Sequence, residues 1–327
     1  MRTLHQALKL SVATSAMAMA LAATGVAQAQ DAELRHVVVG MQPISTLIPA
    51  YFAQEFGWFA EEGLKVEFKP EVGGVDIVTS VVAGDFDFGY SNQTSLLIAA
   101  SRGLPVVAVA NGFVGETQNE TGNNAIVVRA DSDIQSLADL EGRRVSSNTL
   151  QNFVHLSILA ALENNGIENP AEAVEIIEVP FPDVVSLVAQ GQVDAGWVVE
   201  PFVAAALAND LRVISYPVYE VDPNGIMFSA YFTNRNFLEE NPELVDGFVR
   251  AIYRGQQYAI DNPDEVRAAF PKFNSNVSQA IADSFYLPEW RPSLTPEDFQ
   301  LGADLAIRYG FMPSMPDLEA LVHEPGE

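Results

Sequence analysis

Short runs of β-branched and aromatic residues alternate along the chain with segments whose apolar residues recur at helical spacing. Residues 37–39 and the alternating run 64–68 have the pattern of strands, whereas the apolar positions between residues 44 and 52 have the spacing of a helix. A strand followed by a helix and a second strand is typical of a doubly wound α/β domain. The pattern therefore predicts this class of fold from residue 37 onward.

The alternation continues in two series, which a polar stretch over residues 115–124 separates. The first series adds predicted helices over 76–83 and 94–102 and predicted strands over 88–90 and 106–110. The second begins at Ala125 and has predicted helices over 133–140, 152–164 and 183–190 and predicted strands over 144–147, 174–179 and 193–198. A predicted strand over 226–233 follows Pro223, and the helix-rich region after it begins with Asn241-Pro242-Glu243.

A repeated sequence motif indicates that the two series are copies of one structural module. Residues 84–90 and 191–197 share the pattern Gly-x-x-Asp-x-Gly-aromatic, and each copy follows an amphipathic helix. We expect the first glycine to end that helix with a positive φ. We expect the aromatic residue to lie toward the carboxyl end of the next strand, where doubly wound sheets bind ligands. A recurrent helix-to-strand turn without common ancestry is the alternative.

Together these patterns predict an α/β protein of two lobes, each a doubly wound sheet flanked by helices. The first lobe is expected to consist of residues 30–120 and 226–327, and the second lobe of residues 121–225. The chain would cross between the lobes twice, so we expect hinge strands near 124–129 and 226–233.

The first 29 residues have the pattern of a secretory signal peptide. Arg2 and Lys9 precede an apolar run over residues 10–23, and a small-x-small sequence ends at Ala29, after which cleavage is expected. An N-terminal membrane anchor is the alternative, but the apolar run is shorter than the roughly 20 residues that span a bilayer. Because Gln30 rather than cysteine follows the cut, we expect a periplasmic protein that is not a lipoprotein and has no direct membrane anchor.

Charge and cysteine content exclude several classes of function. The chain has 43 acidic and 17 basic residues and a net charge of −26. The predicted signal peptide holds two of the basic residues and none of the acidic ones, so 15 basic and 43 acidic residues remain, a balance of −28. Such a field repels nucleic acids and anionic lipid headgroups. Since cysteine is absent, disulfides, thiolate metal sites and thiol nucleophiles are excluded as well.

Seven motifs carry a family resemblance, in this order: residues 56–64 (FGWFAEEGL), Gly73-Gly74, residues 83–89 (Ala-Gly-x-x-Asp-x-Gly), 102–105 (RGLP), 139–145 (DLEGRRV), 191–195 (Gly-x-Val-Asp-Ala) and 200–202 (Glu-Pro-Phe). With them the chain resembles the bacterial solute-binding proteins of the nitrate, sulfonate and taurine group, which includes relatives that bind pyrimidine precursors of thiamine. The resemblance implies the type II periplasmic binding protein fold and a ligand cleft between two lobes. It also implies delivery of the ligand to an ABC permease that a cytoplasmic ATPase drives. We expect a monomer without cofactor or metal.

Candidate ligand contacts lie beyond the carboxyl ends of strands, beside helix N-termini with free N–H groups. In the first lobe they are Gln42, Ser45, Gly74, Asp76, Tyr90, Ser91, Asn92, Gln93, Thr94 and Asn111. In the second lobe they are Ser147, Asn148, Thr149, Phe181, Asp183, Trp197 and Glu200. The hydroxyls and amides offer hydrogen bonds to a small polar ligand, although the same residues are good helix N-caps.

Aromatic and charged residues narrow the range of possible ligands without identifying one. Three aromatic residues are candidates to contact a planar or apolar ligand: Tyr90, Phe181 and Trp197. The alternative is that these side chains lie in the hydrophobic core. The candidate loops hold acidic residues but no lysine or arginine. The resemblance implies a receptor for a small polar molecule such as a sulfonate, taurine or nitrate. Because receptors for such anions usually need positive potential, a neutral or zwitterionic heterocycle, for example a pyrimidine, is the alternative. Binding is expected to close the cleft about the hinge.

An enzyme or a sensor built on the same fold is a second alternative. The chain has no HExxH zinc signature, no P-loop and no GxSxG elbow. His155 is near the predicted second-lobe loops, but a packed or solvated histidine on a helix is the preferred interpretation. Yeast pyrimidine synthases that resemble this family depend on a cysteine-rich motif, which this chain lacks. A sensor would need a separate membrane partner, so we expect a transport receptor and no enzyme.

Overall fold

The computed structural model describes residues 34–71, 73–115, 117–118 and 121–324. The predicted signal peptide, residues 1–29, lies outside the described residues. The chain divides into a short unit, Met1–Arg35, and a large compact unit, His36–Glu327, which holds every described helix and strand apart from the first residue of the first strand, Arg35. None of the helices described has both the length and the apolar character needed to cross a bilayer.

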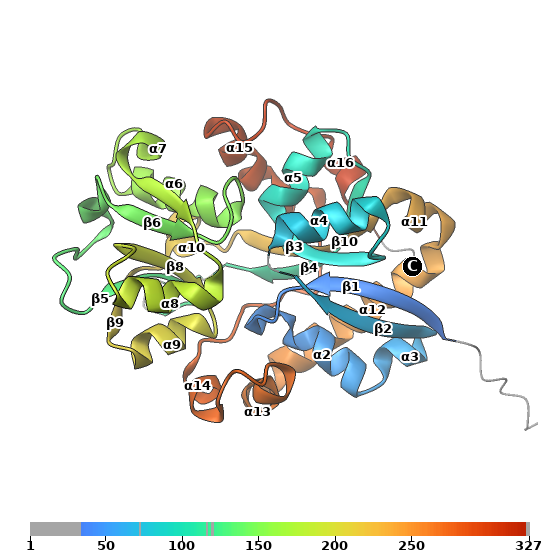
Figure 1. The fold of residues 1–327 in the computed structure, drawn as a ribbon. Helices are drawn as coiled ribbons and strands as arrows, with labels where there is room; N and C mark the ends of the chain where they lie inside the picture. Colours follow the sequence, from blue (N-terminus) through green and yellow to red (C-terminus); the bar gives the residue numbers. More distant parts are fainter. Residues whose placement is uncertain (1–33, 72, 116, 119–120, 325–327) are drawn as a thin grey trace, which may run out of the picture. The chain divides into compact units, whose positions relative to one another are not determined.

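The first sheet has five strands in the order β2-β1-β3-β10-β4. They are β1 (Arg35–Met41), β2 (Leu64–Pro70), β3 (Phe88–Asn92), β4 (Val106–Val114) and β10 (Met227–Asn234). β1 is parallel to β3, whereas β10 is antiparallel to both of its neighbours, β3 and β4. Figure 1 shows that this sheet therefore combines blue and cyan strands from the start of the chain with a strand from far along it.

The second sheet has five strands in the order β7-β6-β8-β5-β9. They are β5 (Asn124–Arg129), β6 (Arg144–Ser147), β7 (Glu175–Glu178), β8 (Ala195–Val199) and β9 (Leu211–Ser215). β6 is parallel to β7 and β8, and β5 is antiparallel to β8 and β9. Each sheet thus has its antiparallel strand in the fourth position, so the two sheets have one design. The predicted α/β fold with two helix-flanked sheets is confirmed.

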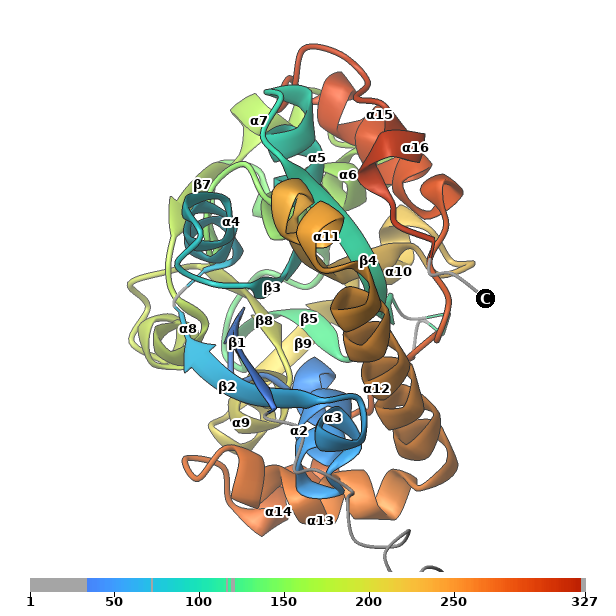
Figure 2. The same ribbon diagram turned by 90° about the vertical axis from the view of Figure 1, so that its right-hand side faces the viewer.

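Helices cover both faces of each sheet. Against the first sheet, α4 (Gly74–Ala83) and α5 (Gln93–Ser101) pack on one face, and α2 (Ile48–Glu55), α3 (Trp58–Glu61) and α12 (Pro242–Asp261) lie on the other, as Figure 2 shows. Against the second sheet, α8 (Phe181–Ala189) and α9 (Phe202–Ala208) pack on one face. The other helices that follow β6 and β9 are α6 (Phe153–Asn164), α7 (Pro170–Ala173) and α10 (Pro217–Val221).

Five further helices follow β10 in the part of the chain that the structure describes. They are α11 (Arg235–Glu240), α13 (Pro263–Phe273), α14 (Gln279–Ser284), α15 (Gln300–Arg308) and α16 (Leu318–Leu321). Three short 3₁₀ turns complete the described elements: η1 (Ser45–Leu47), η2 (Leu137–Leu140) and η3 (Pro296–Phe299). After α16 the chain reaches the outer edge of β4, where Val322 bridges Ala108 and the backbone N–H of His323 donates to the Ala108 carbonyl at 2.9 Å.

The aspartate of the repeated motif has the same structural role in both sheets. Oδ2 of Asp87 accepts a hydrogen bond from the backbone N–H of Val38 at 2.8 Å, which joins the start of β3 to β1. Oδ2 of Asp194 accepts from the backbone N–H of Arg144 at 2.8 Å, which joins the start of β8 to β6. In each sheet the motif therefore joins the central strand to its parallel neighbour by a hydrogen bond.

The glycines of the motif behave as predicted. Gly84 is the C-cap of α4 with φ 82°, and Gly191 follows the last turn of α8 with φ 70°. Both are in the left-handed region that favours glycine.

The predicted helix over residues 133–140 is wrong, because only the 3₁₀ turn η2 forms there. Oδ2 of Asp139 accepts from the backbone N–H groups of Gln135 and Ser136 at 2.9 and 3.0 Å. This capping box makes Ser136 the residue before the turn. Of the turn's residues, Leu137 and Leu140 are buried. The short turn is therefore long enough to bury both leucines.

Neighbouring side chains of a strand contribute to hydrophobic clusters on opposite faces of the sheet. In β5, Ala125 and Val127 pack with the small cluster beneath α8 and α9, while Ile126 and Val128 join the main cluster on the opposite face. The main cluster extends from the first sheet into this second one. Both faces of the second sheet are therefore fixed by hydrophobic packing.

Gly255 lets α12 pack directly against the backbone of α2 at Pro49. A Cβ atom there would lie 2.2 Å from the Pro49 carbonyl oxygen and 2.9 Å from its carbonyl carbon, neither of which can rotate away. Although alanine is the better helix former by about 1 kcal/mol, we expect Gly255→Ala to lower the free energy of unfolding by about 2 kcal/mol or more. Urea denaturation measures this change.

Gly247→Ala is the matched control in the same helix. A Cβ there would lie 3.2 Å from Cβ and Oε2 of Glu62 and 3.5 Å from Nη2 of Arg250, and among its nearest neighbours there is no backbone atom. Its unfolding free energy should therefore stay within about 1 kcal/mol of the wild type. Equal losses in the two variants would contradict the assigned contact.

Candidate functional site

A small cavity of about 30 Å³ lies between residues of the two sheets and their helices; we call it the inner cavity. From the first sheet and its loops it is lined by Gln42, Ile44, Tyr90, Ser91, Asn92, Phe113, Phe228 and Ser229. From the second sheet and its helices it is lined by Asn148, Asn152, Val154, Phe181 and Val199. Amide and hydroxyl groups thus meet aromatic rings at one point of the molecule.

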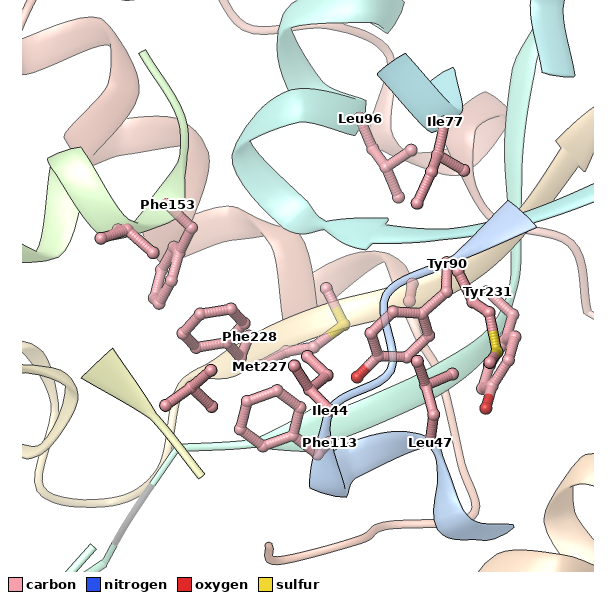
Figure 3. Packing of buried hydrophobic residues seen from close by; sticks show 14 of the residues in the cluster. Ile44, Leu47, Ile77, Tyr90, Leu96, Phe113, Phe153, Met227, Phe228 and Tyr231 are labelled. Atoms are coloured by element: carbon pink, nitrogen blue, oxygen red, sulfur yellow. The ribbon is translucent and has the colours of Figure 1, made fainter. Parts of the chain in front are cut away.

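Aromatic rings form the apolar wall of the inner cavity. Phe228 stacks on Phe113 with ring centroids 4.7 Å apart and meets the edge of Phe153 at 4.6 Å. Figure 3 shows these three rings together with Ile44 near the start of β10. On the second-sheet side, Phe181 stacks on Trp197 at 5.7 Å. Flat ligand surfaces would pack well against such rings.

A chain of hydroxyl groups runs through the first-sheet side. Oγ of Ser229 donates to Oη of Tyr90 at 2.6 Å, and that phenol donates to Oγ1 of Thr46 at 2.9 Å. Burial raises the pKa of Tyr90, although both hydrogen bonds oppose the rise. The phenol is therefore neutral and acts as a polar hydrogen-bonding group, not as an anion.

Asn92 connects the two sides of the cavity through one oxygen atom. Its Oδ1 accepts from the backbone N–H of Ser95 at 3.0 Å, which caps α5, and from that of Phe153 at 3.1 Å, which begins α6. The sequence places Asn92 at the end of β3, so its side chain is both a cap and a bridge between elements of the two sheets.

A second amide cluster lies at the start of α6. Nδ2 of Asn152 donates to Oδ1 of Asn148 at 2.8 Å and to Oγ1 of Thr149 at 2.9 Å. Oδ1 of Asn152 accepts from the backbone N–H of His155 at 3.0 Å, so this residue is also the N-cap of α6. Oγ of Ser147 donates to the carbonyl of Thr149 at 2.6 Å. The loop is thus held in one conformation, with two of its amides facing the inner cavity.

Glu200 is a buried carboxyl group with only 2% of its surface exposed. It accepts from the backbone N–H groups of Ala204 and Tyr286, both at 3.1 Å. Burial raises the pKa of Glu200 to about 8, even though both hydrogen bonds favour the ionised form. Its backbone carbonyl also accepts from the N–H of Ser45 at 3.3 Å. Glu200 therefore joins segments of the two sheets and does not line the inner cavity.

A larger pocket of about 500 Å³ adjoins the inner cavity; we call it the outer pocket. It is lined by Gln42, Pro43, Ile44, Pro70, Glu71, Pro180, Phe181, Pro182, Asp183 and Phe202. Gln42, Ile44 and Phe181 line both spaces. Neither lining contains a lysine, arginine or histidine.

The remaining predicted site residues occupy structural positions around these spaces. Ser45 is fully buried and its Oγ accepts from Nδ2 of Asn123 at 2.9 Å. Gly74 allows α4 to begin against β3, since a Cβ there would lie 2.5 Å from Oγ of Ser91. Asp76 is exposed in the first turn of α4. None of these three lines either space.

Four further candidates are buried in the interior. Nε2 of Gln93 donates to the carbonyl of Met227. Thr94, Asn111 and Trp197 are fully buried, and neither the Trp197 indole N–H nor the Asn111 amide has a hydrogen-bond partner among the described residues. Of the seventeen predicted residues, the structure brings Gln42, Tyr90, Ser91, Asn92, Asn148 and Phe181 together at the inner cavity, and Asp183 lines the outer pocket.

Several lining residues lie outside the predicted set. Asn152 precedes a helical run and carries the signal of an N-cap, which could have added it. Phe228 and Ser229 are near the start of a strand that returns from the second sheet, so a rule based on carboxyl ends of strands cannot find them.

Comparison of the sequence with known proteins identifies the family of this chain. A family model described as NMT1/THI5 like matches residues 45–266. The taurine-binding periplasmic protein of Escherichia coli (strain K12) is 29% identical over 218 residues, which are 66% of this chain and 64% of that protein. The chain thus spans less than two thirds of the length of this relative. A 4-amino-5-hydroxymethyl-2-methylpyrimidine phosphate synthase of Saccharomyces cerevisiae is 22% identical over 256 residues, 74% of this chain and 72% of that one.

The fold also matches solved structures. The alkanesulfonate-binding protein SsuA from Xanthomonas axonopodis pv. citri bound to MOPS gives a TM-score of 0.73 at 17% identity, covering 88% of this chain and 98% of that chain. At this identity the likeness concerns the fold alone, which is that of the periplasmic binding proteins.

Because one oxygen of Asn92 caps two helices, its loss should cost more than the loss of an ordinary cap. We expect Asn92→Ala to lower the free energy of unfolding by about 2–3 kcal/mol, measured by urea denaturation. Ser278, whose Oγ caps only α14 at 3.3 Å, provides the control. Ser278→Ala should cost about 1 kcal/mol or less, and a similar cost for both variants would contradict the shared cap.

The raised pKa of Glu200 should make stability fall as the pH rises. The folded carboxyl has a pKa of about 8 against an ordinary value of 4.5, so the folded protein binds the extra proton between these values. The stabilisation is complete below the ordinary value and is lost as the pH rises through the folded value. Glu200→Gln cannot ionise. Its unfolding free energy relative to the wild type should therefore improve by several kcal/mol between about pH 5 and pH 8.5.

Urea denaturation at several pH values tests this expectation. Glu178→Gln, at an exposed position of β7, should follow the wild type at every pH. Parallel pH profiles of the wild type and Glu200→Gln would show that Glu200 ionises normally in the folded protein.

Proposed function

Because this chain belongs to the NMT1/THI5-like family, we propose that it is a periplasmic receptor that delivers a small polar molecule to an ABC importer. The observation that carries the proposal is the inner cavity, where polar side chains from both sheets converge among aromatic rings. A cavity of this kind, between two lobes, is a common location for ligand sites. The names of the taurine-binding relative and of the alkanesulfonate-binding neighbour support the same role.

The chemistry of the cavity favours a neutral or zwitterionic ligand over a simple anion. Its polar lining consists of amides and hydroxyls, and no basic residue lines the inner cavity or the outer pocket. The first N–H of α6 is already bonded to Asn92, so the helix terminus offers less to an anion. A nitrate or sulfonate would therefore be bound without a cation beside it. A zwitterion such as taurine or a neutral heterocycle such as a pyrimidine fits better.

The size of the inner cavity supports a cleft that opens and closes. Its 30 Å³ is about the share of volume of one water molecule in the liquid, whereas ligand pockets usually measure about 300–1,000 Å³. Entry of a ligand would separate Asn92 from Phe153 and the Ser45 N–H from the Glu200 carbonyl. We propose that a ligand replaces these contacts as the two sheets close around it.

An enzymatic role finds little support in the site. The histidine nearest to the second-sheet loops, His155, accepts from the backbone N–H of Gln151 at 3.1 Å and packs against Phe311. Burial lowers the pKa of His155 to about 4, and the side chain lines neither space. The synthase relative shares 22% identity, so we propose binding without catalysis.

The partners and the location derive from the receptor role. We propose that the protein is exported by its predicted signal peptide, remains free of lipid, and acts as a monomer in the periplasm. An ABC permease with a cytoplasmic ATPase would accept the ligand from the closed form.

Binding of taurine, a neutral aminopyrimidine and nitrate should differ in a thermal-shift measurement. A compound that binds only the folded protein raises the Tm, so we expect a rise with taurine or with the aminopyrimidine and none with nitrate. Asn148→Ala should weaken the binding of the active compound about tenfold, because one buried hydrogen bond is lost. Phe181→Ala should weaken it further by removing a ring that lines both spaces.

Asn209→Ala provides the control, since Asn209 is exposed and bonds only to its own helix through the Ala205 carbonyl. Trp197 is a poor probe, because truncating a fully buried tryptophan costs about 3–5 kcal/mol of stability. The absence of any Tm rise with all three compounds, or full affinity in Asn148→Ala, would refute the proposed site.

A further inference from the structure

The outer pocket differs from the inner cavity in both size and chemistry. We propose that it binds the apolar body of a protonated amine, with the ammonium group beside Glu71 and Asp183. This inference rests on the proposed receptor function, since it names the class of ligand that the receptor accepts. To the preference for a neutral or zwitterionic ligand over an anion, it adds a preference for positive charge in the outer pocket.

The walls of the outer pocket suit a hydrocarbon ring or a branched chain. Four prolines contribute rigid apolar surface, and two aromatic rings, Phe181 and Phe202, stack with centroids 6.4 Å apart and an angle of 30° between their planes. The volume of about 500 Å³ is several times the roughly 150 Å³ that accommodates benzene in an apolar cavity. A compound with one ring therefore fits without rearrangement of the walls.

Two carboxylates decide the sign of the charge that this pocket accepts. Glu71 and Asp183 both line it, and neither forms an ion pair with any residue that the structure describes. The basic residue nearest to Glu71 in sequence, Lys69, is paired with Glu67 instead. A bound ammonium would thus neutralise charge that the protein leaves uncompensated.

The field of the whole protein acts in the same direction. A net charge of −26 raises the local concentration of cations and lowers that of anions around the molecule. An anionic ligand would have to overcome this field and then pass two carboxylates, whereas an ammonium compound is attracted by both.

The shared walls connect this pocket to the amides of the inner cavity. Gln42, Ile44 and Phe181 line both spaces. A ligand whose apolar body lies against Phe181 can therefore direct an uncharged polar group toward Asn148 and Asn92. The arrangement selects compounds with a cationic end, an apolar middle and a neutral hydrogen-bonding end.

Three probes with the same ring and different charges test the inference directly: benzylammonium, benzyl alcohol and benzoate. Isothermal titration calorimetry of the purified protein should give the lowest Kd for benzylammonium, a Kd several-fold higher for benzyl alcohol, and no measurable binding of benzoate. Added salt should weaken the binding of benzylammonium more than that of benzyl alcohol.

Charge-removing variants assign the effect to the pocket. Asp183→Asn and Glu71→Gln should each raise the Kd of benzylammonium about two- to fivefold, as expected for partly exposed charge pairs, and leave that of benzyl alcohol unchanged. Asp264→Asn is the matched control, because Asp264 also follows a proline, lies in the first turn of a helix and is exposed. It should leave all three Kd values unchanged.

Each outcome bears on one proposal or on both. Binding of benzoate as tight as that of benzylammonium, or full benzylammonium affinity in both pocket variants, would overturn the inference. If benzylammonium fails while taurine or the aminopyrimidine still raises the Tm, the receptor stands and the charge selectivity is wrong. If none of these compounds binds, both proposals fail.

Discussion

Oδ1 of Asn92 accepts hydrogen bonds from two helices whose strands belong to different sheets. Without Asn92, two buried N–H groups at helix starts would lose this hydrogen-bond partner, and buried donors without partners are costly. Asn92, at the end of β3, therefore caps the start of α5 and holds the first residue of α6 beside it. The inner cavity is the space left beside this contact.

Most of the fold could be predicted from sequence because local patterns and packing agree. The repeated motif is the clearest example, since its glycines end helices and Asp87 and Asp194 join central strands to their neighbours. The failure at residues 133–140 has an equally local cause. There the carboxylate of Asp139 caps the N–H groups of Gln135 and Ser136, so that the turn begins after Ser136, and periodicity alone cannot detect such a local cap.

The site was harder to predict than the fold. Residues at the carboxyl ends of β3 and β6, such as Asn92 and Asn148, do reach the cavity. Trp197 lies two residues before the end of β8, on the same face as Val199, which does line the cavity. The tryptophan is nevertheless fully buried in the core, where it packs against Phe181 and Phe228. Phe228 comes from an antiparallel strand that enters the sheet from the other direction. Its role depends on a pairing between residues more than a hundred positions apart, which local sequence does not encode.

The place of β10 in the first sheet has a consequence for the order in which the molecule can assemble. β3 and β4 are not neighbours, because β10 lies between them and bonds to both. A chain that emerges from its N-terminus first can form all five strands of the second sheet, residues 124–215, before residue 227 is available. The first sheet, although it begins earlier, has a gap until then, and its outer edge is covered only when Val322 reaches Ala108. The first sheet is therefore the first to be synthesised and the last to be completed. Because its pairing joins residues far apart in sequence, we expect it to form more slowly than the second sheet.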